Sequence, residues 1–260
     1  MAPEAELYDA IGADYTATRR EDPRLAAAVQ AALGDAASVI NVGAGAGAYE
    51  PCDRRVVAVE PAARMIAQRA RNAAPVIVAH AEALPFADDS FDAAMAVLSD
   101  HHWQDRARGL CEMRRVSRSR AVLFTWDQDF REEFWLTRDY LTAFAGLPGG
   151  MLLRQIAGHL GATRIEPYAI PHDFCDGFLA AYWRRPHAYL DPRVRAGISV
   201  FHRLPAAHVH EALARLAADL QSGRWHERNA ALLNEDEHDL GYRILIADYP
   251  VLPRPSEPLR

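Results

Sequence analysis

Glycines recur at every second position directly after a short apolar run, in the stretch VINVGAGAGAYE. Gly43, Gly45 and Gly47 could form a tight turn whose backbone N–H groups approach a ligand closely, because a Cβ atom there would collide with it. A second apolar run ends in Glu60, 17 residues after Gly43. A carboxylate at the end of a second strand, facing such a turn, can hold the two hydroxyl groups of a ribose. These residues predict a site for a nucleotide-like cofactor.

The glycine spacing alone does not choose the cofactor, because Gly43, Gly45 and Ala48 also satisfy the dinucleotide-binding pattern GxGxxG/A. The motifs that follow discriminate. The first is Glu60-Pro61, with Met65 about one helical turn further on, and the second is Ala81–Phe86. The other two flank the next apolar run, with Ser90–Asp92 before that run and His101–Trp103 after it. With these motifs the chain resembles, over about residues 5–127, the class I S-adenosylmethionine-dependent methyltransferases. The likeness is strongest to the small-molecule branch that includes the quinone-ring methyltransferases. The resemblance implies S-adenosylmethionine as cofactor and methyl transfer to a small organic molecule.

The resemblance also implies a role for each matching position. The glycine turn would pass beneath the amino-acid and ribose portions of the cofactor, Glu60 would bind the ribose hydroxyls, and Met65 would pack on the adenine. Two tyrosines near the N-terminus would close over the cofactor, with an arginine near its carboxylate. The cofactor contacts implied in this way are Tyr8, Tyr15, Arg19, Asn41, Gly43, Ala44, Gly45, Gly47, Glu60, Pro61, Met65, Ala81, Glu82, Leu98 and Ser99.

Three features depart from the family pattern. Asn41 stands where the family usually has an acidic residue on the first strand, so a charged contact to the cofactor's amino group becomes a neutral one. His80 stands where an aspartate often accepts from the adenine amine, a role for which Glu82 could substitute. The stretch 47–55 is too short for the full helix that normally joins the first two strands. We expect about one helical turn there.

Two adjacent histidines, His101 and His102, are the candidate catalytic bases. They follow the fourth expected strand, at the carboxyl edge where ligands bind in open α/β folds. A neutral imidazole, with a reference pKa of about 6.5, can accept a proton at physiological pH. A base is optional, because methyl transfer is an in-line displacement with a neutral leaving group and depends mainly on alignment. The alternative is that one ring bonds to backbone and the other packs beside Trp103.

The candidate substrate contacts are Trp103, His172 and Asp173, the last two just after the sixth expected strand. The clusters 172–175 and 208–210 have ligand-like spacing, but neither has the further ligands that a metal site needs, so no metal is predicted.

The composition excludes several function classes. All 29 basic residues are arginine, and without lysine there can be no pyridoxal or Schiff-base enzyme, Walker A phosphate loop or protein kinase. A net charge of -6 argues against nucleic acid and anionic membranes as partners, and the small-molecule substrate is what the resemblance implies. We see no signal peptide and no apolar run long enough to span a membrane. Three scattered cysteines form no CxxC pair, which favours a reducing, cytoplasmic location.

Apolar runs alternate with helix-like stretches in the first half of the chain, which predicts an α/β fold with a parallel sheet. The expected strands are 38–42, 56–59, 75–79, 93–98, 121–125, 163–170 and 242–247, the last one antiparallel. The expected helices are 23–33, 61–72, 105–118, 151–160 and 208–220. We therefore expect a seven-stranded, mostly parallel sheet of the Rossmann-like methyltransferase type, with a helical cap inserted between the last two strands.

In domain terms, residues 1–170 with 241–249 would form the cofactor-binding domain and 171–240 the cap over the substrate. Residues 129–150 would form a second piece of the cap, and 250–260 an extended tail. Two alternatives remain open from the sequence: a Rossmann-type NAD-binding oxidoreductase, and a non-catalytic cofactor-binding protein of the methyltransferase fold. An RNA methyltransferase is disfavoured by the negative charge. The chain could be a monomer or a homodimer.

Overall fold

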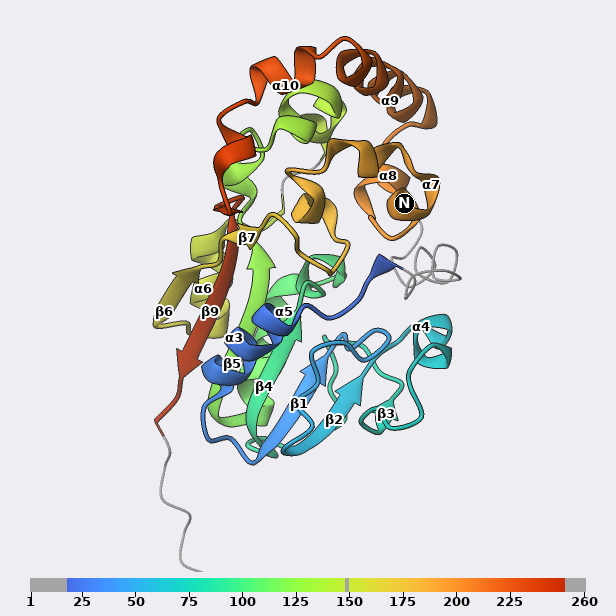
Figure 1. Ribbon diagram of the computed structural model, residues 1–260. Helices are drawn as coiled ribbons and strands as arrows, with labels where there is room; N and C mark the ends of the chain where they lie inside the picture. The colour runs from blue at the N-terminus through green and yellow to red at the C-terminus, as the bar shows by residue number, and fades with distance from the viewer. Residues whose placement is uncertain (1–17, 148–149, 251–260) are drawn as a thin grey trace, which may run out of the picture.

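A seven-stranded sheet forms the centre of the computed structural model, which describes residues 18–147 and 150–250 (Figure 1). The strand order is β3-β2-β1-β4-β5-β9-β6. Neighbouring strands are parallel from β3 to β5, whereas β9 is antiparallel to both of its neighbours. The strands are β1 Ser38–Val42, β2 Arg55–Val59, β3 Val76–Ile77, β4 Phe91–Val97, β5 Ser117–Trp126, β6 Arg164–Pro167 and β9 Tyr242–Asp248. The predicted seven-stranded, mostly parallel sheet is confirmed, including its antiparallel last strand.

Apolar helix faces cover both sides of this sheet. Helix α3 (Pro23–Leu33) begins where the Asp22 side chain accepts from the backbone N–H of Arg24 at 3.0 Å, with proline in the first turn. It packs in a cluster with Val122 and Phe124 of β5. Helices α5 (Arg106–Val116) and α6 (Leu153–Leu160) pack in a second cluster with Leu123. Because successive side chains of a strand point to opposite faces, the two clusters lie on opposite sides of the sheet.

Two elements beside the glycine turn are shorter than expected. The helix expected over 61–72 is only α4 (Ala63–Ala67), and the strand expected over 75–79 is the two-residue edge strand β3. No helical turn forms within 47–55, where the backbone makes turns and bends. Beyond α4 the chain turns, and Arg69 buries its guanidinium against Glu50.

The strand expected over 163–170 is divided into two. Its first part is β6 in the main sheet, and its second part, β7 (Ile170–Pro171), pairs antiparallel with β8 (Glu237–His238) in a separate two-stranded sheet. This small sheet brings together the beginning and the end of the segment expected to be the cap.

Residues 171–240 lie beyond the end of the sheet toward which β4 and β5 run, at the top of Figure 1. Their helices are α7 Pro192–Ala196, α8 Val200–Arg203, α9 Ala206–Gln221 and α10 Arg224–Arg228. Short 3₁₀ or π segments occur at Asp100–His102, Gln128–Phe130, Leu136–Tyr140, Thr142–Gly146, Leu179–Tyr182, Pro186–Leu190 and Leu232–Asn234. None of the helices in the described part of the chain is long and apolar enough to cross a membrane.

Buried tryptophans join this segment to the chain that follows β5. The indole Nε1 of Trp135 donates to the Trp183 carbonyl at 2.8 Å, and the Trp135 ring lies 5.1 Å from the ring of Trp225, centroid to centroid. All three side chains are almost completely buried. Two segments that are far apart in the sequence therefore share one aromatic core above the sheet.

Candidate active site

The glycine turn after β1 packs so closely against its neighbours that only glycine fits. Gly43 has a φ of +69°, and a Cβ on it would lie 2.6 Å from the Cβ of Ser99, just after β4. Gly45 has a φ of +52°, and the Met65 side chain of α4 lies beside it. Both the positive φ angles and the lack of space exclude a larger residue. The turn is thereby held against β4 on one side and α4 on the other.

Glu60 closes the turn from the end of β2. Its carboxylate accepts from the backbone N–H of Gly45 at 2.8 Å and from that of Ala62 at 2.9 Å, and the residue is only 7% exposed. Burial raises the pKa of Glu60, and the two N–H groups oppose that shift only in part. Its remaining lone pairs can accept hydrogen bonds from the hydroxyl groups of a ligand.

A cavity of about 130 Å³, the first cavity, lies at this turn and collects most of the predicted cofactor residues. They are Arg19, Asn41, Gly43, Ala44, Gly45, Glu60, Pro61, Met65, Ala81, Glu82, Leu98 and Ser99. His80 lines it as well. Gly47 is not part of this wall and faces Arg69, whose guanidinium would lie 3.2 Å from a Cβ there. Tyr8 and Tyr15 lie outside the described residues.

Asn41, the residue that departs from the family pattern, is hydrogen-bonded to the carboxylate of Glu50. The Asn41 Nδ2 donates to Glu50 Oε1 at 3.3 Å, and Glu50 in turn forms an ion pair with Arg69 at 2.7 Å. Arg69 also donates to the Ala74 carbonyl at 2.9 Å. This pair, rather than a crossover helix, holds the loop between β1 and β2.

Arg19 is held by two residues that the sequence analysis did not single out. Its Nε donates to Asp176 Oδ1 at 2.6 Å, and the Tyr49 hydroxyl donates to Asp176 Oδ2 at 2.9 Å. Asp176 is 2% exposed, and all three residues line the first cavity. Because Asp176 is 157 residues from Arg19 in the sequence, no local motif could have revealed it.

The chain leaves β4 through a strained residue. Leu98 has a φ of +50°, which is uncommon for a residue other than glycine, and its N–H donates to the Phe124 carbonyl at 2.8 Å. The next side chain, Ser99, donates from its hydroxyl to the Val42 carbonyl at 2.9 Å. These bonds fix the direction in which the following residues leave the sheet.

Asp100 anchors the short helix that carries the two candidate histidines. Its carboxylate is fully buried, accepts from the Thr125 hydroxyl at 2.9 Å, and forms an ion pair with Arg106. Burial by itself would raise the pKa of Asp100, but the Arg106 charge, the neighbouring His101 and the hydrogen bond from Arg106 hold it at about 2. The Asp100 carboxylate is therefore ionised at neutral pH, and its bonds to Thr125 and Arg106 fix the start of this helix.

A second cavity, of about 370 Å³, lies beyond Leu98. Its apolar lining comes from the sheet, from the chain after β5 and from residues 171–240, and includes Trp126, Phe144, Phe178, Ile198, Val200 and Tyr242. The residues that line both cavities are Arg19, Leu98, His102, Trp103 and Gln104. The two cavities thus meet along the chain that follows β4.

The two candidate bases occupy different positions. His102 lines both cavities, whereas His101 lines only the second. Their rings are 3.9 Å apart between centroids. The Nδ1 of His101 lies 3.9 Å from Asp100 Oδ1, which Thr125 already occupies. Trp103, the third member of this motif, packs against Gly109 of α5 and lines both cavities.

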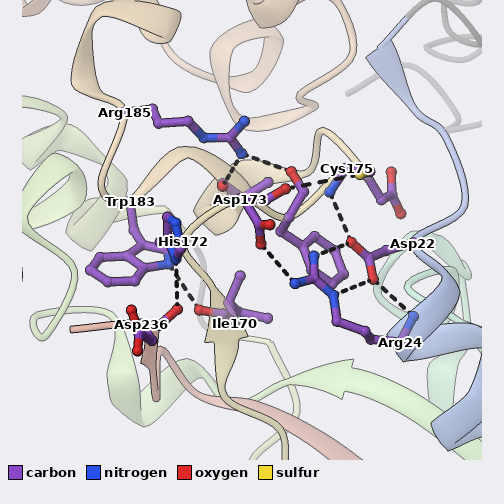
Figure 2. A network of polar contacts seen from close by, with 12 residues as sticks. Asp22, Arg24, Ile170, His172, Asp173, Cys175, Trp183, Arg185 and Asp236 are labelled. Carbon is purple, nitrogen blue, oxygen red and sulfur yellow. Dashed lines mark hydrogen bonds and ion pairs between the residues drawn. The ribbon is translucent and has the colours of Figure 1, made fainter.

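His172 and Asp173 line neither cavity, so the structure does not support their expected role as substrate contacts. Both belong instead to a network of polar contacts (Figure 2). Asp173 accepts from Arg24 of α3 at 2.7 Å, and His172 bonds to the Asp236 carbonyl at 3.1 Å. Asp22 reinforces this contact, because it accepts from the N–H of Cys175 at 3.0 Å as well as from Arg24. Asp173 and the backbone of Cys175 thus anchor the segment after β7 to the start of α3, whereas His172 joins it to the chain before β8. Their position in the sequence does not reveal these contacts.

No group of three or more His, Cys, Asp or Glu residues within 18–147 and 150–250 is arranged to hold a metal ion. The three cysteines are free and exposed.

Comparisons with known proteins now identify the family. The chain is 31% identical to a protein of Anabaena variabilis ATCC 29413 that is assigned as a methyltransferase of an antibiotic biosynthesis pathway. The two structures superpose with a TM-score of 0.80 over 88% of this chain and 98% of that one. The Methyltransferase domain family matches residues 40–125. The chain belongs to the class I S-adenosylmethionine-dependent methyltransferases.

Other solved structures share less with this methyltransferase. The YcgJ protein of Bacillus subtilis is 17% identical, with a TM-score of 0.51 over 86% of this chain and 97% of that one, and has the same fold. Geranyl diphosphate C-methyltransferase of Streptomyces coelicolor A3(2) is 15% identical, with a TM-score of 0.48 over 87% and 78% of the two chains. No curated protein sequence matches the chain.

The residues that line the first cavity are of the kinds that would hold S-adenosylmethionine. Glu60 holds a buried carboxylate beside the glycine turn, and its remaining lone pairs could accept hydrogen bonds from the two hydroxyl groups of a ribose. Met65 offers an apolar surface for adenine beside that turn. Family membership therefore excludes the oxidoreductase alternative that the glycine spacing had left open.

Proposed function

We propose that this methyltransferase transfers a methyl group from S-adenosylmethionine in the first cavity to a small organic molecule in the second. The observation that carries the proposal is the shared wall, in which Leu98, His102 and Trp103 line both cavities. The two cavities meet at these residues, so a methyl donor in the first and an acceptor in the second would come close enough for an in-line displacement. When bound, the cofactor supplies a methyl group that is activated by a sulfonium.

The residues around the first cavity would bind and orient the cofactor. Glu60 would accept from the ribose hydroxyls, and Met65 would pack on the adenine ring. Asn41 would contact the amino group through its side-chain oxygen, with the Glu50 carboxylate behind it. Arg19 would lie near the cofactor's carboxylate, held in place by Asp176.

Residues 171–240 would form a cap that excludes water from the second cavity, together with the chain that follows β5. Phe178, Ile198 and Val200 of this segment line that cavity, which supports the proposal. A site closed in this way protects the methyl group from competing water. Residues 18–170 with 241–249 would then form the cofactor-binding domain.

A base is required only if the acceptor atom carries a proton. His102 is the better of the two candidates, because it alone of the pair lines both cavities. An unprotonated ring nitrogen of His102 would take the acceptor's proton while the methyl group is transferred.

Calorimetric titration of the protein with S-adenosylhomocysteine and with NAD tests the cofactor. We expect binding of the first alone, and about tenfold weaker binding in Glu60→Gln, because a hydrogen bond to a charged group would be lost. Glu211→Gln, on the exposed surface of α9, is the matched control. Since burial raises the Glu60 pKa, wild-type affinity should fall in mildly acidic buffer as the carboxylate is protonated, and Glu60→Gln should show no such fall.

Turnover is tested separately, by following formation of S-adenosylhomocysteine with a panel of small hydroxyl, amine and carboxylate compounds. Cofactor binding without turnover on any of them would favour the non-catalytic alternative.

A further inference from the structure

The lining of the second cavity contains cations but no anion among the described residues. Arg19, Arg106, Arg131 and Arg203 line it, and no described Asp or Glu does. Two of the four are neutralised within the protein, since Arg19 pairs with Asp176 and Arg106 pairs with Asp100. For Arg131 and Arg203, the described part of the chain offers no carboxylate within 4 Å. Two unmatched positive charges therefore line one cavity.

Arg131 is fixed in position although its charge is unmatched. Its Nη1 donates to the Ala145 carbonyl at 3.1 Å, and its guanidinium lies 5.1 Å from the centroid of the Phe144 ring. The Nε has no hydrogen-bond partner among the described residues. One hydrogen bond from a group with five N–H donors leaves most of its donors unused. The stacking on Phe144 holds the side chain without neutralising it.

Arg203 is the last residue of α8, on the cap segment, and its side chain is half-buried. No side-chain hydrogen bond or ion pair holds it within the described ranges. Burying part of a guanidinium without a counter-ion is unfavourable unless a ligand supplies one. Arg131 and Arg203 come from the two separate segments that complete this cavity, so one anion bound by both would draw these segments together.

Between the arginines, the wall is apolar and rich in aromatic rings, with Trp126, Phe144, Phe178 and Tyr242. Such a lining binds a flat or compact apolar body, while a few charged groups set its orientation. A volume of about 370 Å³ suits a molecule with one or two rings.

We propose that the substrate of the second cavity is a small molecule with an apolar body and one anionic group, a carboxylate or a phosphate, which Arg131 and Arg203 bind. Guanidinium groups match the planar, two-oxygen edge of such anions, and both arginines have donors free for it. The proposal rests on the proposed function, because it names the class of molecule to be methylated. In this arrangement the anion positions the acceptor and takes no part in the methyl transfer itself.

The test uses the full chain saturated with S-adenosylhomocysteine and three probes that share one ring: benzoate, phenyl phosphate and benzamide. Dissociation constants are measured by NMR titration. We expect the dissociation constant of benzoate or of phenyl phosphate to be at least about tenfold lower than that of the neutral benzamide. Whichever anion binds more tightly identifies the preferred group. Equal binding of all three probes by the wild type would overturn the proposal.

Variants then test which residues recognise the anion. In the double variant Arg131→Gln/Arg203→Gln the preference for the anion should disappear, while benzamide binds as before. Arg193→Gln, whose side chain is 84% exposed on α7 of the same segment, should retain the full preference. A preference that survives in the double variant would overturn the assignment of these residues. A second double variant, Arg131→Lys/Arg203→Lys, keeps both positive charges and should keep a weaker preference for the anion. It tests the assignment even where the glutamine variant folds poorly.

Affinity for S-adenosylhomocysteine, measured on the same samples, separates this inference from the proposed function. If the first cavity binds S-adenosylhomocysteine but the anionic probes show no advantage, only the substrate class is wrong. If S-adenosylhomocysteine does not bind, the proposed function itself fails.

Discussion

Glu50 and Arg69 form an ion pair in which Arg69 Nη2 lies 2.7 Å from Glu50 Oε1, with the two side chains 7% and 5% exposed, respectively. The pair joins the loop after β1 to the chain between α4 and β3. Arg69 also donates to the Gly45 carbonyl at 3.3 Å, which links the glycine turn to this ion pair. Two side chains thus fix the part of the cofactor site that a crossover helix would otherwise support.

Glu50→Gln should lower the free energy of unfolding by about 3 kcal/mol, because it leaves the Arg69 charge buried without a counter-ion. Glu166→Gln is the matched control, since its pair with Arg164 is about half exposed at both side chains and should contribute less than about 1 kcal/mol. Chemical denaturation of the two variants measures the difference. Equal losses would contradict a special role for the buried pair.

Two glycine-to-alanine variants should change stability in opposite directions. Gly43→Ala forces a residue with a Cβ into a φ of +69° and places that atom 2.6 Å from Ser99 Cβ, so we expect a loss of about 2 kcal/mol or more. Gly158 lies inside α6 with no atom within 4 Å of its Cβ position, so Gly158→Ala should stabilise the protein by about 0.5–1 kcal/mol. Thermal unfolding of both variants tests this prediction, and a destabilised Gly158→Ala would contradict it.

The order of the sheet, and the gathering of most candidate cofactor residues around one cavity, could be predicted because their signals are local. The glycine turn, Glu60 and the residues after β4 each follow an apolar strand directly, and parallel strands bring their carboxyl ends to one edge. The length of α4 could not be predicted in this way. Its apolar spacing continues to about residue 72, but the helix ends at Ala67, and Arg69 turns to a buried ion pair with Glu50, 19 residues away in the sequence.

The residues missed by the sequence analysis are those whose partners are far away in the chain. Asp176 is the last residue of the stretch HDFCD, in which the sequence analysis singled out His172 and Asp173 instead. Only the packing of this stretch against α3 directs Asp173 toward Arg24 and Asp176 toward Arg19. The unmatched Arg131 and Arg203 are equally invisible in the sequence, because every other basic residue is also arginine.

The acid stability of the protein should depend on Asp100. Its pKa of about 2 lies below the ordinary value of 3.8, so its ionised form stabilises the fold above pH 4 and is lost as the pH falls toward 2. A shift of this size corresponds to about 2 kcal/mol. Asp100→Asn should therefore be less stable than wild type at pH 7, and the gap should narrow as the pH falls from 4 to 2. Urea unfolding across this range tests it, and a gap that does not change with pH would refute it.

Substitution of the two adjacent histidines should separate catalysis from packing. His102 lines both cavities, so for an acceptor whose oxygen or nitrogen carries a proton, His102→Ala should lower kcat by about 10²-fold. Its affinity for S-adenosylhomocysteine should stay near the wild-type value, because alignment and cofactor binding depend on other residues. His101→Ala should have a smaller effect on kcat, since His101 lines only the second cavity.

His159→Ala, on the exposed surface of α6, controls for the loss of an imidazole as such. The pH profile of kcat provides an independent readout, because the wild-type rate should fall as His102 becomes protonated and this dependence should disappear in His102→Ala.

If the acceptor is already deprotonated, neither histidine variant should lose much activity, since alignment alone then supplies most of the acceleration. Wild-type turnover of both variants on a hydroxyl acceptor would instead show that the proton leaves by another route.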